Sequence, residues 1–309
     1  MKGVGEMKTW QYALIVFLGG CCYGALSTFV KLAYSAGFTM AEVTGSQYLM
    51  GTLLIWIVAL FSKKKKLTMP QIGKLLISGI PLGLTGIFYY QSLQSLNASL
   101  AVIFLFQFVW IGTFFEWVFY KKTPTIGKVV SIGILVVGSI LAAGVIAEGS
   151  GEVTWQGTVW GLLSALTYTT FVFLSSTVEK DIPAVQKSAL FTTGGLITVL
   201  ILFPPTTLFH LPVLMGVAPY GLYLGLLGVA LPPLLFTIGM PHIGPGLGTI
   251  LTSSELPVAV ILSSLVLAEH VSTSQWLGVV LILGGIVVGN VKISKTKMKS
   301  VAFERESVS

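Results

Sequence analysis

The sequence predicts an all-α integral membrane protein with ten transmembrane helices, built as two inverted five-helix repeats with both termini in the cytoplasm. Three observations support this prediction. The chain is 54% hydrophobic and 9% charged, which leaves too few charges for a hydrated surface over 309 residues. Its basic residues recur in every second gap between apolar segments, and each half of the chain holds an odd number of those segments.

The basic residues predict the orientation of the chain. Seventeen of the eighteen Lys and Arg residues lie in alternate gaps, and Lys31 is the exception. Because short cytoplasmic loops retain Lys and Arg, this alternation places both ends of the chain in the cytoplasm and requires an even number of crossings. The basic groups, in chain order, are Lys2 and Lys8, then Lys63 to Lys66 with Lys74, then Lys121, Lys122 and Lys128, then Lys180 and Lys187, then Lys292, Lys295, Lys297, Lys299 and Arg305.

Apolar segments of about 20 residues predict ten crossings. Each crossing is expected to be a helix, because hydrocarbon cannot satisfy free backbone amides. The loops between them are too short for an extramembrane catalytic domain. The expected crossings are 11–34, 41–61, 71–91, 97–120, 126–147, 155–178, 184–204, 214–240, 245–267 and 273–291.

A division near Ser150 leaves five crossings on each side, so the second half starts from the opposite face of the membrane. The expected organisation is a cytoplasmic N-terminus (1–10), a first repeat (11–147), a second, inverted repeat (155–291) and a basic cytoplasmic tail (292–309). Inverted repeats are typical of proteins that open alternately to the two sides of a membrane. Gly-x3-Gly pairs within the crossings predict close helix packing: Gly20 with Gly24, Gly79 with Gly83, Gly157 with Gly161, Gly221 with Gly225 and Gly285 with Gly289.

Several classes of function are excluded. The net charge of +7 does not indicate nucleic-acid binding, since the basic residues flank apolar runs where anionic lipid headgroups are nearer. Cys21 and Cys22 are adjacent and cannot build a disulfide framework. The chain has no Walker-type loop, no His-Glu-x-x-His motif and no intramembrane Ser/His/Asp set. We therefore expect no enzymatic activity, no cofactor and no metal.

Glu255 is the leading candidate for a functional residue, since it lies about eleven residues into the ninth crossing and so near mid-bilayer. An ionised carboxylate at that depth costs about 3 kcal/mol or more unless it faces water, a partner or a proton. Pro257 removes an amide donor and frees the carbonyl of Ser253, and the hydroxyls of Thr252, Ser253 and Ser254 lie beside the carboxylate. We expect these residues to bind substrate or to exchange a proton. The alternative is a carboxyl group that only joins helices.

The fourth crossing supplies Gln107, which overlays Ser254 when the halves are shifted by 147 residues. Its amide is suited to bind a substrate or equally a neighbouring helix. Tyr89 and Trp110 are candidates for an amphipathic cavity wall, and interfacial aromatic belts are the alternative. The further wall candidates are Tyr23, Tyr90, Gln91, Gln94 and Tyr168.

Prolines within crossings predict gates or hinges. Pro81 in the third crossing, Pro232 and Pro233 in the eighth, and Pro257 in the ninth are expected to interrupt their helices. Glu116 is expected to be a structural residue instead, paired with Lys121 or Lys122 near the cytoplasmic headgroups. Lys31 and Glu42 flank the first outer loop and are expected to form a pair at its rim.

The most specific stretch is Ser253-Ser254-Glu255-Leu256-Pro257-Val258, followed by Leu267-Ala268-Glu269, Gln275-Trp276-Leu277-Gly278 and Gly284-Gly285. This stretch resembles the last two helices of the drug/metabolite transporter superfamily, and in particular of its EamA-type ten-helix members. The resemblance covers 11–291. The first half departs from the pattern, because Trp110 stands at the position of Pro257 and Lys122 at that of Glu269.

The resemblance implies a secondary transporter, with export of amino acids or related amphipathic metabolites as the first expectation. The compact loops and the absence of a targeting segment favour a bacterial plasma membrane. Its partners would be a small-molecule substrate, membrane lipids and, where transport is coupled, protons. An intramembrane enzyme acting on a lipid or prenyl headgroup, or a scaffold without transport, are the alternatives. The substrate, the direction, the coupling ion and the oligomeric state are left open.

Overall fold

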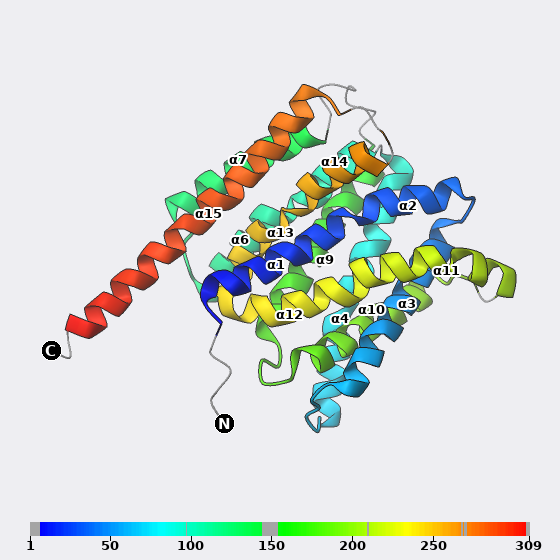
Figure 1. The fold of residues 1–309 in the computed structure, drawn as a ribbon, viewed down its shortest axis with the longest axis horizontal. Coiled ribbons are helices and arrows are strands. Elements are labelled where there is room, and N and C mark those ends of the chain that lie inside the picture. Colours follow the sequence, from blue (N-terminus) through cyan, green and yellow to red (C-terminus); the bar gives the residue numbers. More distant parts are fainter. Residues whose placement is uncertain are drawn as a thin grey trace.

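A computed structural model describes residues 7–96, 98–143, 154–208, 210–266, 268 and 271–306 of the chain. The regular structure of these residues is helical throughout (Figure 1). The elements are α1 (Thr9–Gly24), α2 (Leu26–Ser35), α3 (Met40–Phe61), α4 (Met69–Ser95), α5 (Ala98–Phe106), α6 (Phe108–Tyr120), α7 (Ile126–Ala142), α9 (Trp155–Thr177), α10 (Ala184–Leu202), α11 (Leu211–Gly225), the π-helix η1 (Leu226–Ala230), α12 (Leu231–Ile243), α13 (Pro245–Thr252), α14 (Glu255–Val266) and α15 (Thr273–Glu306).

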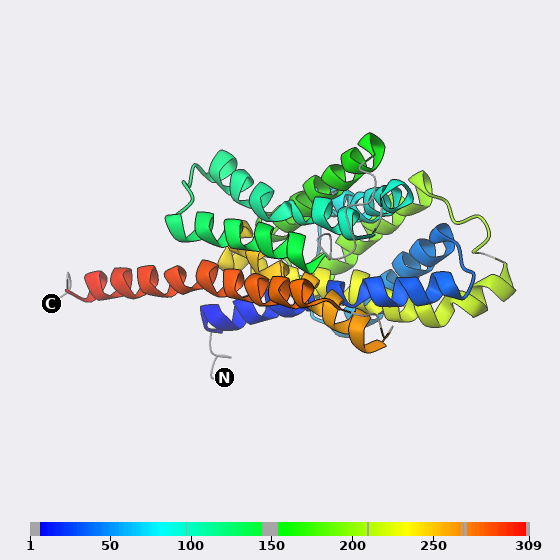
Figure 2. The ribbon, with the colours of Figure 1, turned by 90° about the horizontal axis from the view of Figure 1, so that it is seen from above.

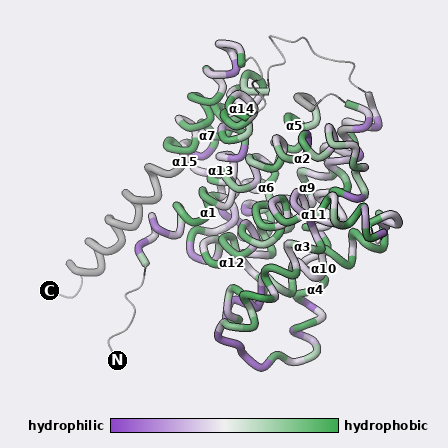
Figure 3. Tube along the Cα trace, turned by 45° about the vertical axis from the view of Figure 1, so that its right-hand side comes forward, coloured by the Kyte–Doolittle hydropathy of each residue, from purple (hydrophilic) through white to green (hydrophobic). Residues whose placement is uncertain are grey.

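Eight helical stretches of the described chain are long and apolar enough to cross a membrane. They are Thr9–Ser35, Met40–Phe61, Met69–Ser92, Ala101–Tyr120, Trp155–Thr177, Ala184–Leu202, Leu211–Ile243 and Pro245–Val266. The segments expected as the fifth and tenth crossings form two shorter apolar helices, Ile126–Ala142 and Thr273–Gly289. Figure 3 shows apolar residues along most of the bundle, with a hydrophilic loop between α3 and α4. The all-helical membrane architecture is therefore confirmed.

Three of the long stretches are interrupted near their middles. The breaks lie at Ala25 between α1 and α2, at Gln107 between α5 and α6, and at Ser253 and Ser254 between α13 and α14. Only the last was predicted, from Pro257. The other two lack a proline. The break at Ala25 directly follows Gly24, a weak helix former, while no such residue adjoins the break at Gln107.

The prolines act differently in the third and eighth crossings. Helix α4 continues through Pro81, so the interruption expected there is wrong. In the eighth crossing, the π-helix η1 ends directly before Leu231, Pro232 and Pro233. The wider turns of a π-helix accommodate the carbonyls that these two prolines leave without an amide donor.

Helices of each half pack mainly on helices of the other half, and these contacts are related by the repeat. Helix α4 of the first half packs on α9 and α10 of the second, while α12 packs on α1 and α11 packs on α3. In the division into two repeats, α4 corresponds to α11, η1 and α12, whereas α9 corresponds to α1 and α10 to α3. Each contact in one direction therefore has a counterpart in the other. Equivalent helices also meet directly, α3 with α10 and α7 with α15.

Glycine pairs make the closest helix contacts possible. In α4, a Cβ at Gly79 would meet the backbone of Phe191, and one at Gly83 would meet the backbone of Gly195, both in α10. In α11, the pair Gly221 and Gly225 lies equally close to α3, at Ser46 and Gly51 respectively. Close packing at these Gly-x3-Gly motifs is confirmed, and the two pairs occupy corresponding places in the two halves.

Helices α7 and α15 form a pair at one edge of the bundle, as Figures 1 and 2 both show. The hydroxyl of Ser131 in α7 donates to the carbonyl oxygen of Gly285 in α15 at 2.7 Å. Helix α15 then extends beyond the bundle to Glu306. The segment expected as a separate basic tail therefore begins as a continuation of this helix.

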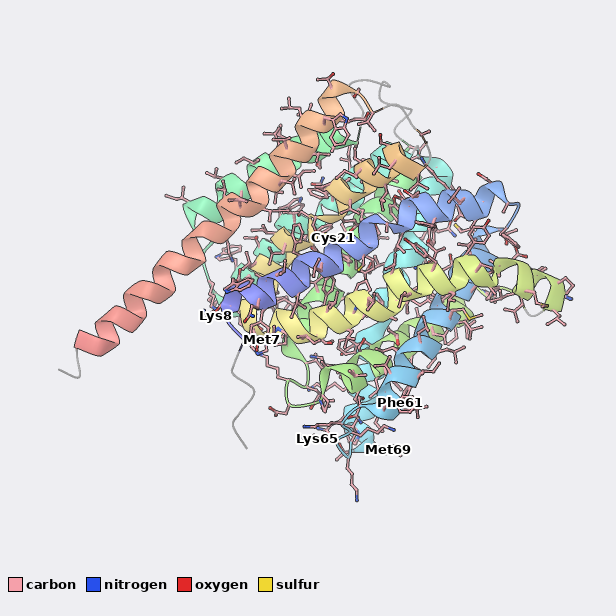
Figure 4. The ribbon with its side chains drawn as sticks, viewed as in Figure 1. Met7, Lys8, Cys21, Phe61, Lys65 and Met69 are labelled. Carbon is pink, nitrogen blue, oxygen red and sulfur yellow. The ribbon has the colours of Figure 1, made fainter. Side chains whose placement is uncertain are left out.

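The basic loops gather at one end of the bundle. The backbone of Lys65, after α3, exchanges two hydrogen bonds of 3.0 Å with the side chain of Gln186 in α10. The ammonium of Lys74 and the amide of Gln71 hydrogen bond to the Glu179 carboxylate, and they hold the pKa of that carboxyl below its ordinary value. Figure 4 places Lys8 at the start of α1 and Lys65 in the loop before α4.

Candidate functional site

A cavity of about 370 Å³ lies within the bundle, a volume typical of small-molecule sites. Within the described residues, its lining contains one carboxylate, that of Glu255, one ammonium, that of Lys31, and six tyrosines. It is formed by α1, α2, α3, α4, α5, α9, η1 and α14. The lining residues are Tyr23, Gly24, Leu26, Ser27, Val30, Lys31, Tyr34, Gln47, Tyr48, Leu82, Thr85, Gly86, Tyr89, Tyr90, Val102, Leu105, Tyr168, Gly228, Glu255, Leu256 and Ala259.

The cavity opens toward one end of the bundle. Its residues Ser27 and Lys31 in α2 are exposed, whereas Tyr48 and Tyr168 deeper in the lining are each only 4% exposed. Lys31 lies near the end of α2, just before α3 begins, and Lys65 follows the far end of α3. The mouth is therefore at the end opposite to the basic loops.

Aromatic rings close the other end. The ring of Tyr23 packs against those of Tyr168 and Phe236, each with centroids 5.9 Å apart. Phe236 in turn lies 6.3 Å from Phe171, and Phe171 lies 6.1 Å from Phe191. Both Phe171 and Phe236 have no exposed surface. These rings form a continuous floor between the cavity and the end of the bundle that carries the basic loops.

The break in the ninth crossing positions Glu255. The amide of Ser253 donates to the Ile250 carbonyl and that of Ser254 to the Leu251 carbonyl, a tight turn that ends α13. Helix α14 then begins at Glu255, in a first turn where the helix dipole favours a negative charge. Pro257 follows within that turn, where a missing amide donor costs little.

The carboxylate of Glu255 has no hydrogen-bond or ion-pair partner among the described residues. Three tyrosines, Tyr23, Tyr89 and Tyr168, lie within its electrostatic reach. In this same lining, the hydroxyls of Tyr23 and Tyr34 are buried and have no partner in the described part of the chain. The site thus combines an uncompensated acid with aromatic faces and unused hydroxyls, which suits a ligand that has both a polar and an apolar part.

The hydroxyl groups of the residues before Glu255 donate hydrogen bonds to backbone carbonyls. Thr252 and Ser253 donate to the carbonyl of Thr249, at 3.0 and 3.3 Å. Ser254 donates to the carbonyl of Phe17 in α1 at 2.8 Å. All of them are buried and none lines the cavity. Thr252, Ser253 and Ser254 therefore lie beside Glu255 in the chain, and their hydrogen bonds stabilise the end of α13 and join it to α1.

The structure does not bring Gln107 and Trp110 into the cavity lining. The Gln107 amide donates to the Ile103 carbonyl at 2.9 Å and accepts from the Trp110 indole at 2.8 Å. Trp110 is 42% exposed and faces the outside of the bundle beside α7. Gln107 instead marks the break in the fourth crossing, as Ser254 does in the ninth.

Of the other predicted wall residues, Tyr23, Tyr89, Tyr90 and Tyr168 line the cavity, whereas Gln91 and Gln94 do not. The prediction did not include Tyr34, Gln47, Tyr48 or Thr85, which line it as well. For α3, the polar residue Gln47 within an apolar helix was the feature of the sequence that could have indicated a cavity-lining face. Its amide oxygen accepts from the Tyr90 hydroxyl at 3.4 Å.

The remaining acidic residues of the crossings have structural partners. Glu116 pairs with the ammonium of Lys128, rather than with the expected Lys121 or Lys122. Glu42 caps its own helix by accepting from the Thr39 amide at 2.8 Å, and its other oxygen accepts from the Thr207 hydroxyl at 2.7 Å. Nowhere in the described residues do three or more His, Cys, Asp or Glu side chains gather as metal ligands would.

The family model of the EamA-like transporter family matches residues 10–144 and 155–291, once in each half. The chain belongs to the EamA-like transporter family. The resemblance to the drug/metabolite transporter superfamily is therefore confirmed, and the two matches fit the repeat-related packing of the halves. As a member of this family, the chain is a multi-pass membrane protein with a two-repeat architecture.

The fold of this EamA-like protein is also similar to a solved structure titled "Crystal structure of protein". The two share 17% sequence identity and align with a TM-score of 0.72 over 90% of this chain and 98% of the other. This likeness supports the fold alone. Comparison with curated proteins finds no match.

Proposed function

We propose that this EamA-like protein is a secondary transporter that moves a small organic metabolite, such as an amino acid or a related amphipathic compound, across a plasma membrane. In this proposal it has ten crossings in two inverted repeats, both termini are cytoplasmic, and the cell is bacterial. The observation that supports it most directly is the cavity with Glu255 in its lining, since a carboxylate without a partner inside a membrane-spanning bundle is expensive to keep in a protein that only needs to fold.

Transport in this proposal follows alternating access. The cavity is open at one end and closed at the other by the rings of Tyr23, Tyr168, Phe171 and Phe236. Because the contacts between the halves are related by the repeat, a swap of the conformations of the halves would open the floor and close the mouth. The breaks before Glu255 and at η1, with Pro232, Pro233 and Pro257 beside them, are the proposed hinges. With the mouth opposite to the basic loops, the described conformation would face outward.

Proton exchange at Glu255 is part of the proposal. A proton and a cationic group of the substrate would each neutralise the same carboxylate, so only one of them can be bound at a time. This competition would couple export of substrate to entry of a proton.

Flux through proteoliposomes tests the proposal. The purified protein is assayed with a panel of metabolites, with and without a pH gradient. We expect Glu255→Gln to abolish substrate flux and its response to the gradient. The matched control is Glu116→Gln, which removes an acid that is paired with Lys128 and lies outside the cavity lining, and which should retain most of the flux.

Two outcomes would count against the proposal. Equal flux from Glu255→Gln and the wild type would remove Glu255 from the mechanism. An absence of flux for every compound, from a protein that remains folded and monodisperse, would contradict transport itself.

A further inference from the structure

The two charged residues of the cavity lining, Glu255 and Lys31, lie in different parts of the cavity. Its only carboxylate among the described residues belongs to Glu255, whose backbone carbonyl packs against Gly24 in α1. Its only ammonium in that part of the chain belongs to Lys31, seven residues further along the same crossing and toward the exposed mouth. At 1.5 Å per residue, the Cα atoms of Gly24 and Lys31 are separated by about 10 Å along the crossing.

The lining around the carboxylate is aromatic. Tyr23, Tyr89 and Tyr168 are the tyrosines within electrostatic reach of Glu255, and Tyr34 lies beyond them toward the mouth. Aromatic faces attract cations, and this attraction is stronger where water is excluded. A carboxylate beside such rings suits a single positive charge on an apolar body.

The same surroundings disfavour an amino acid. Its carboxylate is separated from its ammonium by only one carbon atom, so an ammonium bound to Glu255 would bring a second negative charge next to the first. Among the described residues, the lining beside Glu255 offers that charge tyrosine hydroxyls, and the only ammonium of the lining, that of Lys31, lies toward the mouth. A buried carboxylate without a positive partner is penalised strongly.

We propose that the substrate of this cavity is a monocationic amine with an aromatic or alkyl body and no carboxylate next to its nitrogen. This inference rests on the proposed transport function and, within its class of small amphipathic metabolites, favours amines over amino acids. In the bound state the ammonium would lie against Glu255 and the body would extend past Tyr34 toward the mouth.

Three probes that share one ring isolate the effect of charge: 2-phenylethylamine, phenylalanine and 3-phenylpropanoate. Flux of each into proteoliposomes that contain the full-length protein is measured at one pH. We expect the amine to be moved about tenfold or more faster than the amino acid, because a site that pairs one charge rejects an analogue whose extra charge stays unpaired. The acid should not be moved.

Variants at Tyr89 test the aromatic part of the inference. Tyr89→Phe keeps the ring and should retain the preference for the amine, whereas Tyr89→Leu removes the ring face and should reduce it severalfold. Thermal unfolding of each variant in detergent, with and without the amine, reports binding separately from folding. A folded Tyr89→Leu that the amine stabilises as much as the wild type would contradict the role of the ring.

The outcomes separate this inference from the transport function. Flux of phenylalanine that equals or exceeds that of the amine, with loss in Glu255→Gln, would overturn the amine class and leave transport in place. A protein that moves none of the three probes but moves another metabolite would also overturn it. If no compound of the wider panel is moved, the transport proposal itself fails.

Discussion

At the scale of single residues, two glycines of α4 have opposite surroundings. A Cβ at Gly79 would meet the backbone of Phe191 in α10, while one at Gly73 would meet nothing within 4 Å. A backbone contact cannot yield as the end of a flexible side chain can. We expect Gly79→Ala to destabilise the protein by roughly 1–3 kcal/mol, the cost of overpacking. Gly73→Ala should be neutral or slightly stabilising, because Ala is the better helix former.

Thermal unfolding in detergent, followed by tryptophan fluorescence, compares the two variants directly. The expected result is a lower midpoint for Gly79→Ala alone. Equal midpoints would show that α4 and α10 can separate without cost, and would remove the Gly-x3-Gly pair as a determinant of their packing.

Residue identity predicted that Glu255 would lie beside a cavity, and it predicted the cavity wall only in part. A carboxylate at mid-membrane depth is unusual enough to be found from its position alone. Gln107 and Trp110 lie at similar depth, yet neither lines the cavity. In a crossing that is apolar all round, depth follows from counting residues, but the face that turns inward depends on contacts with other helices. Tyr34 and Tyr48 were missed for this reason.

At the scale of elements, the ninth crossing has a break whose cause can be tested. Pro257 cannot donate to the Ser253 carbonyl, and α14 begins two residues before it, at Glu255. In Pro257→Ala the new amide can donate to that carbonyl and extend regular helix across the break. We expect unfolding stability equal to or above that of the wild type, and severalfold lower flux of the transported compound.

The control for this variant is Pro219→Ala, which removes a proline inside α11 that does not line the cavity. It should leave flux close to the wild-type level. Wild-type flux in Pro257→Ala as well would show that transport does not depend on the break.

The positions of the apolar helices were predicted better than the positions of the breaks within them. The apolar segments located the crossings, because a run of about 20 apolar residues is a property of the local chain. The break at Gln107 and the one at Ala25 follow no proline, and Pro81 stands in a helix that continues through it. A helix in a bundle keeps or loses individual hydrogen bonds according to what neighbouring helices supply, so the breaks depend on tertiary contacts.

At the scale of the whole molecule, alternate basic gaps and an odd number of segments per half predicted a two-repeat membrane protein, which the family match confirms. These arguments count segments and charges and need no contact. These counts do not predict the conformation, because an outward-open and an inward-open arrangement of the same helices would have the same segments and charges. The mouth beside Lys31 and the floor of aromatic rings belong to one of these two arrangements.

The proposed orientation of this conformation makes a prediction about access. In a protein whose Cys21 and Cys22 are replaced by Ala, single cysteines are placed at Ser27, an exposed residue of the cavity lining, and at Lys65, in a basic loop at the other end. A membrane-impermeant maleimide added outside right-side-out vesicles should modify Ser27→Cys and block flux. Lys65→Cys should react only after the vesicles are permeabilised, because basic loops remain cytoplasmic. Modification of Lys65→Cys from outside, with Ser27→Cys protected, would reverse the orientation and make the described cavity inward-facing.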